Sequence, residues 1–176
     1  MMATTISQIE ALPEAYPASP DGLSDAAAAI AETVWQRLES YIAHRWSARD
    51  VTWVVEGPGE WVPPLKPATI STVEVWSSAE EFETCSLAAS PLGGYWLPCT
   101  GPYRFAGTVG SGEVPARVNE AFKRLAEYLA AEPVSPGVIA EAADGVATFT
   151  YAGPAFMARA LQNSGAADLL RPYRRA

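Results

Sequence analysis

Prolines and glycines recur along the middle of the chain, between Gly57 and Gly112, and divide much of it into short pieces. Within these pieces, β-branched and aromatic residues alternate with polar ones, a pattern typical of strands. The candidate strands are residues 51–55, 70–76, 84–88, 95–97 and 103–108. Short strands separated by turns predict a small antiparallel sheet or barrel-like β module over residues 51–109.

Helical periodicity is found on both sides of this module. Ser24 is a favourable N-cap, and apolar residues recur at helical spacing from Ile30 onward, which predicts one amphipathic helix over residues 24–46. Pro115 suits the first turn of a second helix, predicted over residues 115–131. The apolar face of this second helix holds Val118, Phe122, Leu125 and Leu129.

The two ends of the chain differ from the middle. Residues 1–23 are rich in proline and predict an extended arm, and residues 154–176 form a separate C-terminal segment with short helical pieces. Residues 24–153 between them are expected to form a single domain. The chain has 176 residues, 49% of them hydrophobic, so it can bury a normal core. The predicted class is α+β: amphipathic helices packed around an inserted small antiparallel β module, with extended N- and C-terminal arms.

Charge is distributed unevenly along the chain. Residues 1–158 contain 8 Lys/Arg and 19 Asp/Glu, a net charge of −11, whereas residues 159–176 contain four arginines and one aspartate, a net charge of +3. An acidic body should repel DNA rather than bind it. A short basic segment on such a body suggests docking onto an acidic protein groove or onto nucleic acid, although a merely solubilising terminus would have the same charge.

No stretch approaches the roughly 18 apolar residues that a membrane span needs. Residues 1–12 lack the basic region and the long apolar stretch of a signal peptide. We therefore expect a protein that is made and folded in the cytoplasm, with no membrane partner.

A catalytic site or a metal site is not predicted. His44 is the only histidine, and it lies at the end of the first predicted helix, where the helix dipole favours it without any catalytic role. Cys85 and Cys99 lack zinc-ligand spacing and are predicted to be half-buried residues of a sheet. We therefore expect no catalytic residue, no metal and no cofactor.

Two further sequence patterns can be explained without a functional site. The glycines at positions 107, 110 and 112 lack the order of a phosphate-binding loop and are interpreted as turn residues. The acidic residues Glu80, Glu81 and Glu83 are expected in a solvated loop, and no glycosidase geometry can be inferred from them.

Aromatic residues support an alternative function. The β module contains Trp53, Trp61, Trp76, Tyr95, Trp96 and Tyr103. Exposed, such side chains could stack on sugar rings or bases, and the module would then bind carbohydrate or another ligand. We expect most of them in the core or at a subunit interface instead. A hydrolase is the least favoured class, because neither a base nor a nucleophile can be named.

Four stretches of the chain, in order, resemble the head–tail connector (adaptor) proteins of tailed bacteriophages, and most closely the adaptor of gene transfer agent particles. The first is an Ala-rich helix from Ile30 to Arg49 that runs into ESYIAHRWSARDVTWVVEGPGEW at residues 39–61. The others are LKPATISTVEVW at 65–76, VPARVNEAFKRLAEYLA at 114–130 and ALQNSGAADLLRPYRRA at 160–176. The last is the most specific, and together they cover about half of the chain. The stretch from Glu80 to Gly101 matches nothing in the family.

The resemblance implies a structural protein of the neck of a phage-like particle, made in the bacterial cytoplasm. It implies a ring, a dodecamer, between the portal protein and the stopper, the next connector, with DNA passing through the channel without specific binding. It also implies that the C-terminal segment docks on the portal. The predicted docking residues are Arg159, Leu169, Leu170, Arg171, Pro172, Tyr173, Arg174 and Arg175.

Overall fold

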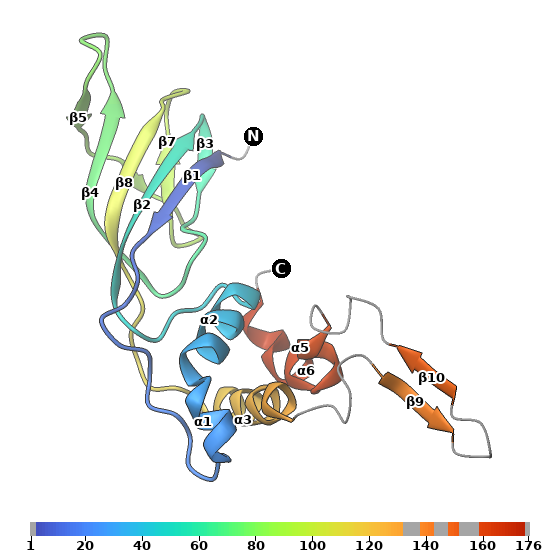
Figure 1. The fold of residues 1–176 in the computed structure, drawn as a ribbon. Coiled ribbons are helices and arrows are strands. Elements are labelled where there is room, and N and C mark those ends of the chain that lie inside the picture. The colour runs from blue at the N-terminus through green and yellow to red at the C-terminus, as the bar shows by residue number, and fades with distance from the viewer. Residues whose placement is uncertain (1–2, 132–137, 143–147, 152–158, 175–176) are drawn as a thin grey trace. The chain divides into compact units, whose positions relative to one another are not determined.

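The computed structural model describes residues 3–131, 138–142, 148–151 and 159–174, and the fold is of the predicted α+β class (Figure 1). The chain forms two compact units. Residues 1–17 and 43–113 make up the β unit, and residues 18–42 and 114–176 make up the helical unit. The β unit is therefore an insertion within the helical one, as the order of predicted elements suggested.

The β unit contains eight described strands in two sheets. Their bounds are β1 Thr4–Glu10, β2 Arg49–Glu56, β3 Gly59–Trp61, β4 Ala68–Trp76, β5 Phe82–Thr84, β6 Ala88–Ala89, β7 Tyr95–Leu97 and β8 Tyr103–Val109. The larger sheet has the order β1-β2-β8-β4-β5 and the smaller one β3-β7-β6, and every pairing is antiparallel. The candidate strands of the β module thus form, with β5 and β6 replacing the single strand expected over residues 84–88.

Aromatic side chains form the core of the β unit. The ring of Trp61 stacks on that of Phe105 with centroids 4.2 Å apart, and Trp53 approaches Trp61 edge-on at 5.7 Å. All three are buried, as are Tyr103 and Leu97. Aromatic residues of this size supply most of the apolar area that a small sheet can bury, which explains why so many of them are concentrated between residues 53 and 105.

Gly107 is not a turn residue, contrary to expectation, because it lies inside β8. A Cβ atom at this position would lie 2.1 Å from the backbone oxygen of Thr69 on the neighbouring strand β4. Only glycine allows the two strands to approach this closely. Gly110 and Gly112, with φ of 94° and 90°, are turn residues as predicted.

The N-terminal segment predicted as an extended arm is extended, but residues 4–10 are strand β1 of the larger sheet. β1 pairs antiparallel with β2, with a register shift between Thr5 and Ser7. In the sequence TTISQIE, apolar residues do not occur at every second position, as they do in a strand with one buried face. The alternation pattern therefore does not predict this strand.

The helical unit contains α1 Asp25–Ala29, α2 Ala31–Tyr41, α3 Ala116–Ala130, α5 Ala160–Asn163, α6 Ala166–Leu170 and the 3₁₀ turn η1 Arg171–Tyr173. An antiparallel hairpin, β9 Val138–Ala142 and β10 Thr148–Tyr151, belongs to the same unit. Trp35 of α2 packs on Phe122 of α3 with ring centroids 4.8 Å apart, and Leu38 and Leu125 are fully buried. None of the described helices is both long and apolar enough to cross a membrane.

Ser24 caps the first helix as predicted. Its hydroxyl oxygen accepts a hydrogen bond from the backbone N–H of Ala27 at 3.3 Å. Its own N–H and hydroxyl also donate to the two carboxylate oxygens of Glu127 on α3, at 2.7 and 2.9 Å. Ser24 therefore provides an acceptor for a backbone N–H at the start of α1 and also links α1 to α3 through a residue 103 positions away in sequence.

The first helix is shorter than predicted and is interrupted. Ile30 has φ −106° and ψ 12° and separates α1 from α2, which ends at Tyr41 rather than Trp46. Beyond it, the backbone of residues 43–45 bonds to Lys66 instead: the Lys66 N–H donates to Ala43 O and the Arg45 N–H donates to Lys66 O, both at 2.8 Å. This tertiary pairing overrides a helical pattern that the sequence continues for five more residues.

Candidate interaction surface

The C-terminal segment is part of the helical unit's core. α6 packs along α3, and Ala160, Ala166 and Leu170 are fully buried. Leu170 was expected to fill a pocket of a partner protein. That expectation does not fit the structure, because its side chain already lies inside its own unit.

The other predicted docking residues lie at or near the surface. Arg159, Arg171, Pro172 and Arg174 are exposed, while Leu169 and Tyr173 are half-buried beside them. Arg175 lies outside the described residues. The segment therefore presents arginines outward and leucines inward or at the margin, which is an arrangement suited to a partner with surface carboxylates.

Arg174 is held in place by α2. Its guanidinium lies 4.7 Å from the ring centroid of Tyr41, and its Nη1 donates to the Tyr41 hydroxyl at 3.2 Å. No local pattern could reveal this contact, because the two residues are 133 positions apart.

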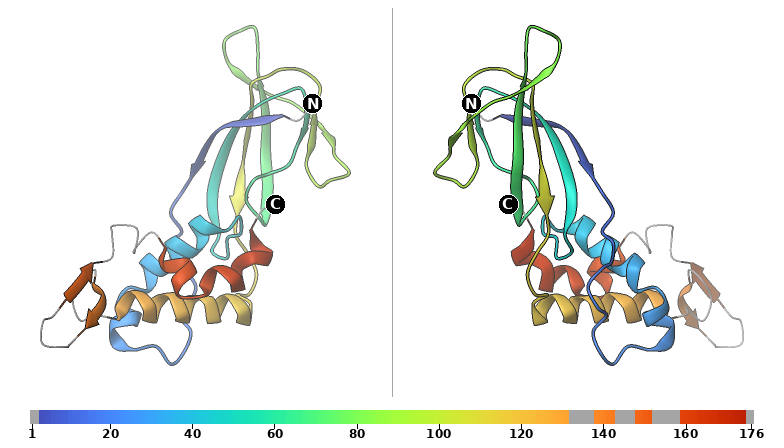
Figure 2. Two further views of the ribbon diagram at one scale, coloured as in Figure 1. Left: turned by 90° about the vertical axis from the view of Figure 1, so that its right-hand side faces the viewer. Right: turned by 90° about the vertical axis from the view of Figure 1, so that its left-hand side faces the viewer.

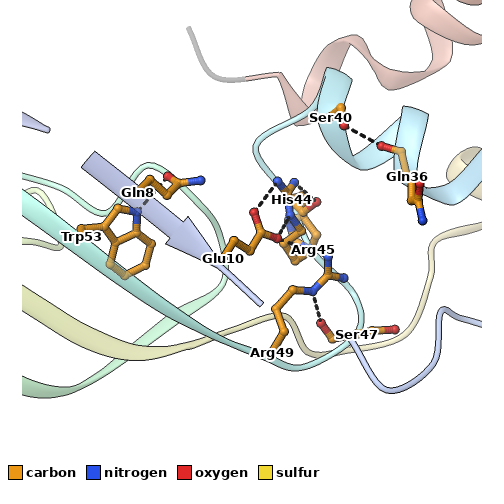
Figure 3. A network of polar contacts seen from close by, with 9 residues as sticks. All are labelled: Gln8, Glu10, Gln36, Ser40, His44, Arg45, Ser47, Arg49 and Trp53. Carbon is orange, nitrogen blue, oxygen red and sulfur yellow. Dashed lines mark hydrogen bonds and ion pairs between the residues drawn. The ribbon is translucent and has the colours of Figure 1, made fainter. Parts of the chain in front are cut away.

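A shallow groove of about 460 Å³ lies next to this contact in the helical unit. Its lining residues are Thr33, Gln36, Arg37, Ser40, Tyr41 and Leu161. Ser40 donates to the backbone oxygen of Gln36 at 2.7 Å (Figure 3). Arg37 lies in the wall of the groove and Arg174 is stacked on Tyr41, so basic groups flank a groove whose lining is mainly apolar. The candidate surface thus extends from the C-terminal segment onto α2.

A second polar cluster lies in the β unit, where Glu10 of β1 pairs with two arginines (Figure 3). Its carboxylate is 2.6 Å from Nε of Arg45 and 3.2 Å from Nη1 of Arg49. Both guanidinium groups are buried, and they also donate to the backbone oxygens of His44 and Ser47. A carboxylate shared by two buried arginines is a structural anchor, and it fixes the end of β1.

His44 does not lie at a helix end, contrary to expectation, because α2 ends three residues earlier. Its imidazole packs against Trp46 with ring centroids 4.7 Å apart. Burial, together with the charge of Arg45, lowers the pKa of His44. The ring is therefore neutral at pH 7, and its surroundings are those of a packed side chain. Among the described residues, no three His, Cys, Asp or Glu side chains are grouped to hold a metal ion.

Cys99 differs from its prediction as a half-buried sheet residue. It is exposed and lies in the segment between β7 and β8, whereas Cys85 is half-buried as expected. The Cys99 thiol lies 2.8 Å from the hydroxyl of Tyr103. Burial, followed by this hydrogen bond, raises the pKa of Tyr103 to about 12. The pair contributes to packing at the end of β8.

The tryptophans of the β unit divide into two groups. Trp53 and Trp61 are buried, and their indole N–H groups donate to Gln8 and Thr5, so they are core residues. Trp76 and Trp96 remain 43% and 54% exposed. A carbohydrate-binding function would therefore depend on these last two side chains, and Trp76 is already packed edge-on against Phe82 at 5.0 Å.

Taken together, these units define a fold class: a helical unit interrupted by an antiparallel β unit, with a basic C-terminal surface. No family model and no curated protein matches the chain. Among solved structures, a chain in the neck of a native gene transfer agent particle, computed with C12 symmetry, is similar with TM-score 0.54 and 15% identity, covering 88% of this chain and 84% of that one.

Two further structures agree. A chain in the neck of an empty gene transfer agent particle, computed with C6 symmetry, has TM-score 0.53, and one in the native virion has TM-score 0.54. Both are 15% identical and cover 100% of this chain and 96% of theirs. The chain has the fold of a component of these particles. The resemblance to head–tail connectors of gene transfer agents, inferred from four stretches of sequence, is confirmed at the level of the fold.

Proposed function

We propose that this chain is a structural head–tail adaptor of a phage-like particle. It forms a ring between the portal and the stopper, through which DNA passes. The observation that supports this most strongly is the match over the full length of the chain to a component of gene transfer agent necks.

The charge of the chain supports a conduit role. The β unit contains 4 Lys/Arg and 10 Asp/Glu, so most of its surface charge is negative. DNA would be repelled by such a surface rather than held by it. A channel through which DNA must move benefits from weak, non-specific contact. The dodecameric copy number follows from the resemblance to the family.

The C-terminal surface is proposed to dock on the portal. Its exposed arginines, Arg159, Arg171 and Arg174, would pair with portal carboxylates, with Pro172 exposed beside Arg171 and Arg175 at the end of the segment. Leu169 and Tyr173, half-buried at its margin, would add apolar contact. Arginine beside aromatic and leucine side chains is the usual composition of an interface centre. Leu170 is excluded from this set, because it belongs to the core.

Charge reversal at the surface tests this docking. Arg171→Glu combined with Arg174→Glu should leave the chain at normal levels, yet filled heads should accumulate without tails in cells that produce the particle. Arg117→Glu is the matched control, because Arg117 is an exposed arginine on α3 outside the docking surface. Normal numbers of tailed particles from the double variant, counted by electron microscopy, would contradict the docking role.

Truncation after Gly153 is a poorer test of docking than these surface substitutions. Removal of everything after Gly153 would take away α5 and α6 and expose the α3 face on which α6 packs. Loss of tails in that variant would follow from unfolding as much as from loss of docking, so the surface substitutions are preferred.

A further inference from the structure

In a strand that covers a core, apolar side chains usually face the core and polar ones face solvent. β1 has the reverse arrangement. Thr5 and Gln8 face inward, where their side-chain oxygens accept hydrogen bonds from the indole N–H groups of Trp61 at 3.0 Å and Trp53 at 2.8 Å. The buried indoles need these acceptors. Ile6 and Ile9 are left 60% and 70% exposed, and Leu12, just beyond the strand, is 80% exposed.

β1 also offers an unpaired edge. It is the first strand in the order β1-β2-β8-β4-β5, and no described strand pairs with its other side. An open edge flanked by exposed isoleucines is the kind of surface that monomeric proteins avoid, because it templates pairing with another strand. The Glu10–Arg45–Arg49 cluster holds this edge firmly on the sheet instead of leaving it free to fold away.

The opposite side of the same sheet has a second open stretch. β5 pairs with β4 only at Glu74–Trp76, and the Cys85 N–H extends this contact to Val73. Residues 68–72 of β4 pair with β8 on one side, and on the side away from β8 no described strand lies beside them. Thr69 and Ser71 in this stretch are exposed. Figure 2 shows β1 and the pair β4–β5 on opposite sides of the sheet.

The two open edges run in opposite directions. β1 is antiparallel to β2, β2 to β8 and β8 to β4, so β1 and β4 point in opposite ways. When copies are arranged around an axis parallel to the strands, a given strand points the same way along that axis in every copy. β1 of one copy then lies antiparallel to β4 of the next, which continues the pattern of the sheet.

We propose that copies of this chain associate edge to edge, with β1 of one copy pairing with residues 68–72 of β4 in the next. Each copy uses two different surfaces, so the contact is heterologous, the kind of contact that forms a ring when the rotation between neighbouring copies closes. Ile6 and Ile9 gain cross-strand neighbours from the next copy, which removes their exposed apolar surface from water. This inference rests on the proposed ring function and names the surfaces that build the ring.

Cysteine cross-linking tests the contact. In a chain with Cys85→Ser and Cys99→Ser, Ile9→Cys is combined with Thr69→Cys, since Ile9 and Thr69 lie on the same face of the sheet by their pairings with Thr52 and Thr108. Particles that carry this chain are treated with a short bismaleimide. We expect a ladder of cross-linked multimers up to the closed ring, with more than half of the chain linked.

Two controls sharpen the result. Ile9→Cys with Leu92→Cys, which is exposed on the turn between β6 and β7, should give no ladder. Ile9→Cys alone should also give none, and dimers from it would show that β1 pairs with β1 and overturn the proposal. Chain present in particles without a ladder would overturn the edge contact and leave the adaptor function standing. Chain absent from particles would overturn both.

Discussion

Removal of the Glu10 carboxylate tests how firmly β1 is anchored. The side chains of Glu10, Arg45 and Arg49 are only 18%, 9% and 4% exposed, so the Glu10→Ala variant removes a carboxylate that is bonded to two buried guanidinium groups. Loss of one partner from a buried ion pair typically costs 3–5 kcal/mol. Both arginines retain backbone acceptors, at His44 and Ser47, which reduces the expected cost to about 2–4 kcal/mol.

A loss of this size is easily measured. For a chain of this length it lowers the melting temperature by roughly 5–15 °C. Thermal melts followed by tryptophan fluorescence suit the experiment, because Trp53 of β2 donates a hydrogen bond to Gln8, which lies on β1 together with Glu10. Glu14→Ala is the matched control, since Glu14 is an exposed acid in the same segment, and it should change the melting temperature by no more than 1–2 °C. A Glu10→Ala melt within 2 °C of this control would refute the anchoring role of the cluster.

Three other predictions follow from the packing. Leu38→Ala and Leu125→Ala should each lower the free energy of unfolding by about 2–5 kcal/mol in chemical denaturation, because both side chains are fully buried. Glu120→Ala removes an exposed i,i+4 pair and should lower it by well under 1 kcal/mol. The reverse ranking would show that the helix faces are misassigned. Since the pKa of Tyr103 is raised to about 12, the unfolded chain loses this proton near pH 10 while the folded chain keeps it; stability should fall from pH 10 to 12, and less steeply in Tyr103→Phe. His44→Gln should leave particle yield unchanged to within a few-fold, and complete loss at normal protein levels would show an essential role for this ring.

The elements that could be predicted from sequence are those whose signals are local. The strands over residues 70–76 and 95–97 and the helix over 115–131 follow from alternation, turn residues and helical spacing, and each appears within a few residues of its prediction. Ser24 as an N-cap is likewise a local property. These elements are the ones in which intrinsic preference and tertiary structure agree.

The errors occur where a distant partner decides the outcome. The first helix stops at Tyr41 because residues 43–45 bond to Lys66, and β1 forms because its polar side chains serve buried indoles in other strands. The same applies to the candidate surface. Composition indicated a basic docking segment, but only the fold shows that Leu170 faces inward and that Arg174 rests on Tyr41.

The interruption of the helical unit by the β unit has a consequence for folding kinetics. α2 and α3 must meet across all of residues 43–113, and the Ser24–Glu127 contact closes a separation of 103 positions. Closing so long a flexible loop is entropically unfavourable, and topologies dominated by such contacts fold slowly. A β unit that folds first shortens the effective loop by holding residues 43 and 113 in one body. We therefore expect substitutions that destabilise the aromatic core around Trp61 to slow the assembly of the helices as well, although none of the described helices contributes to that core.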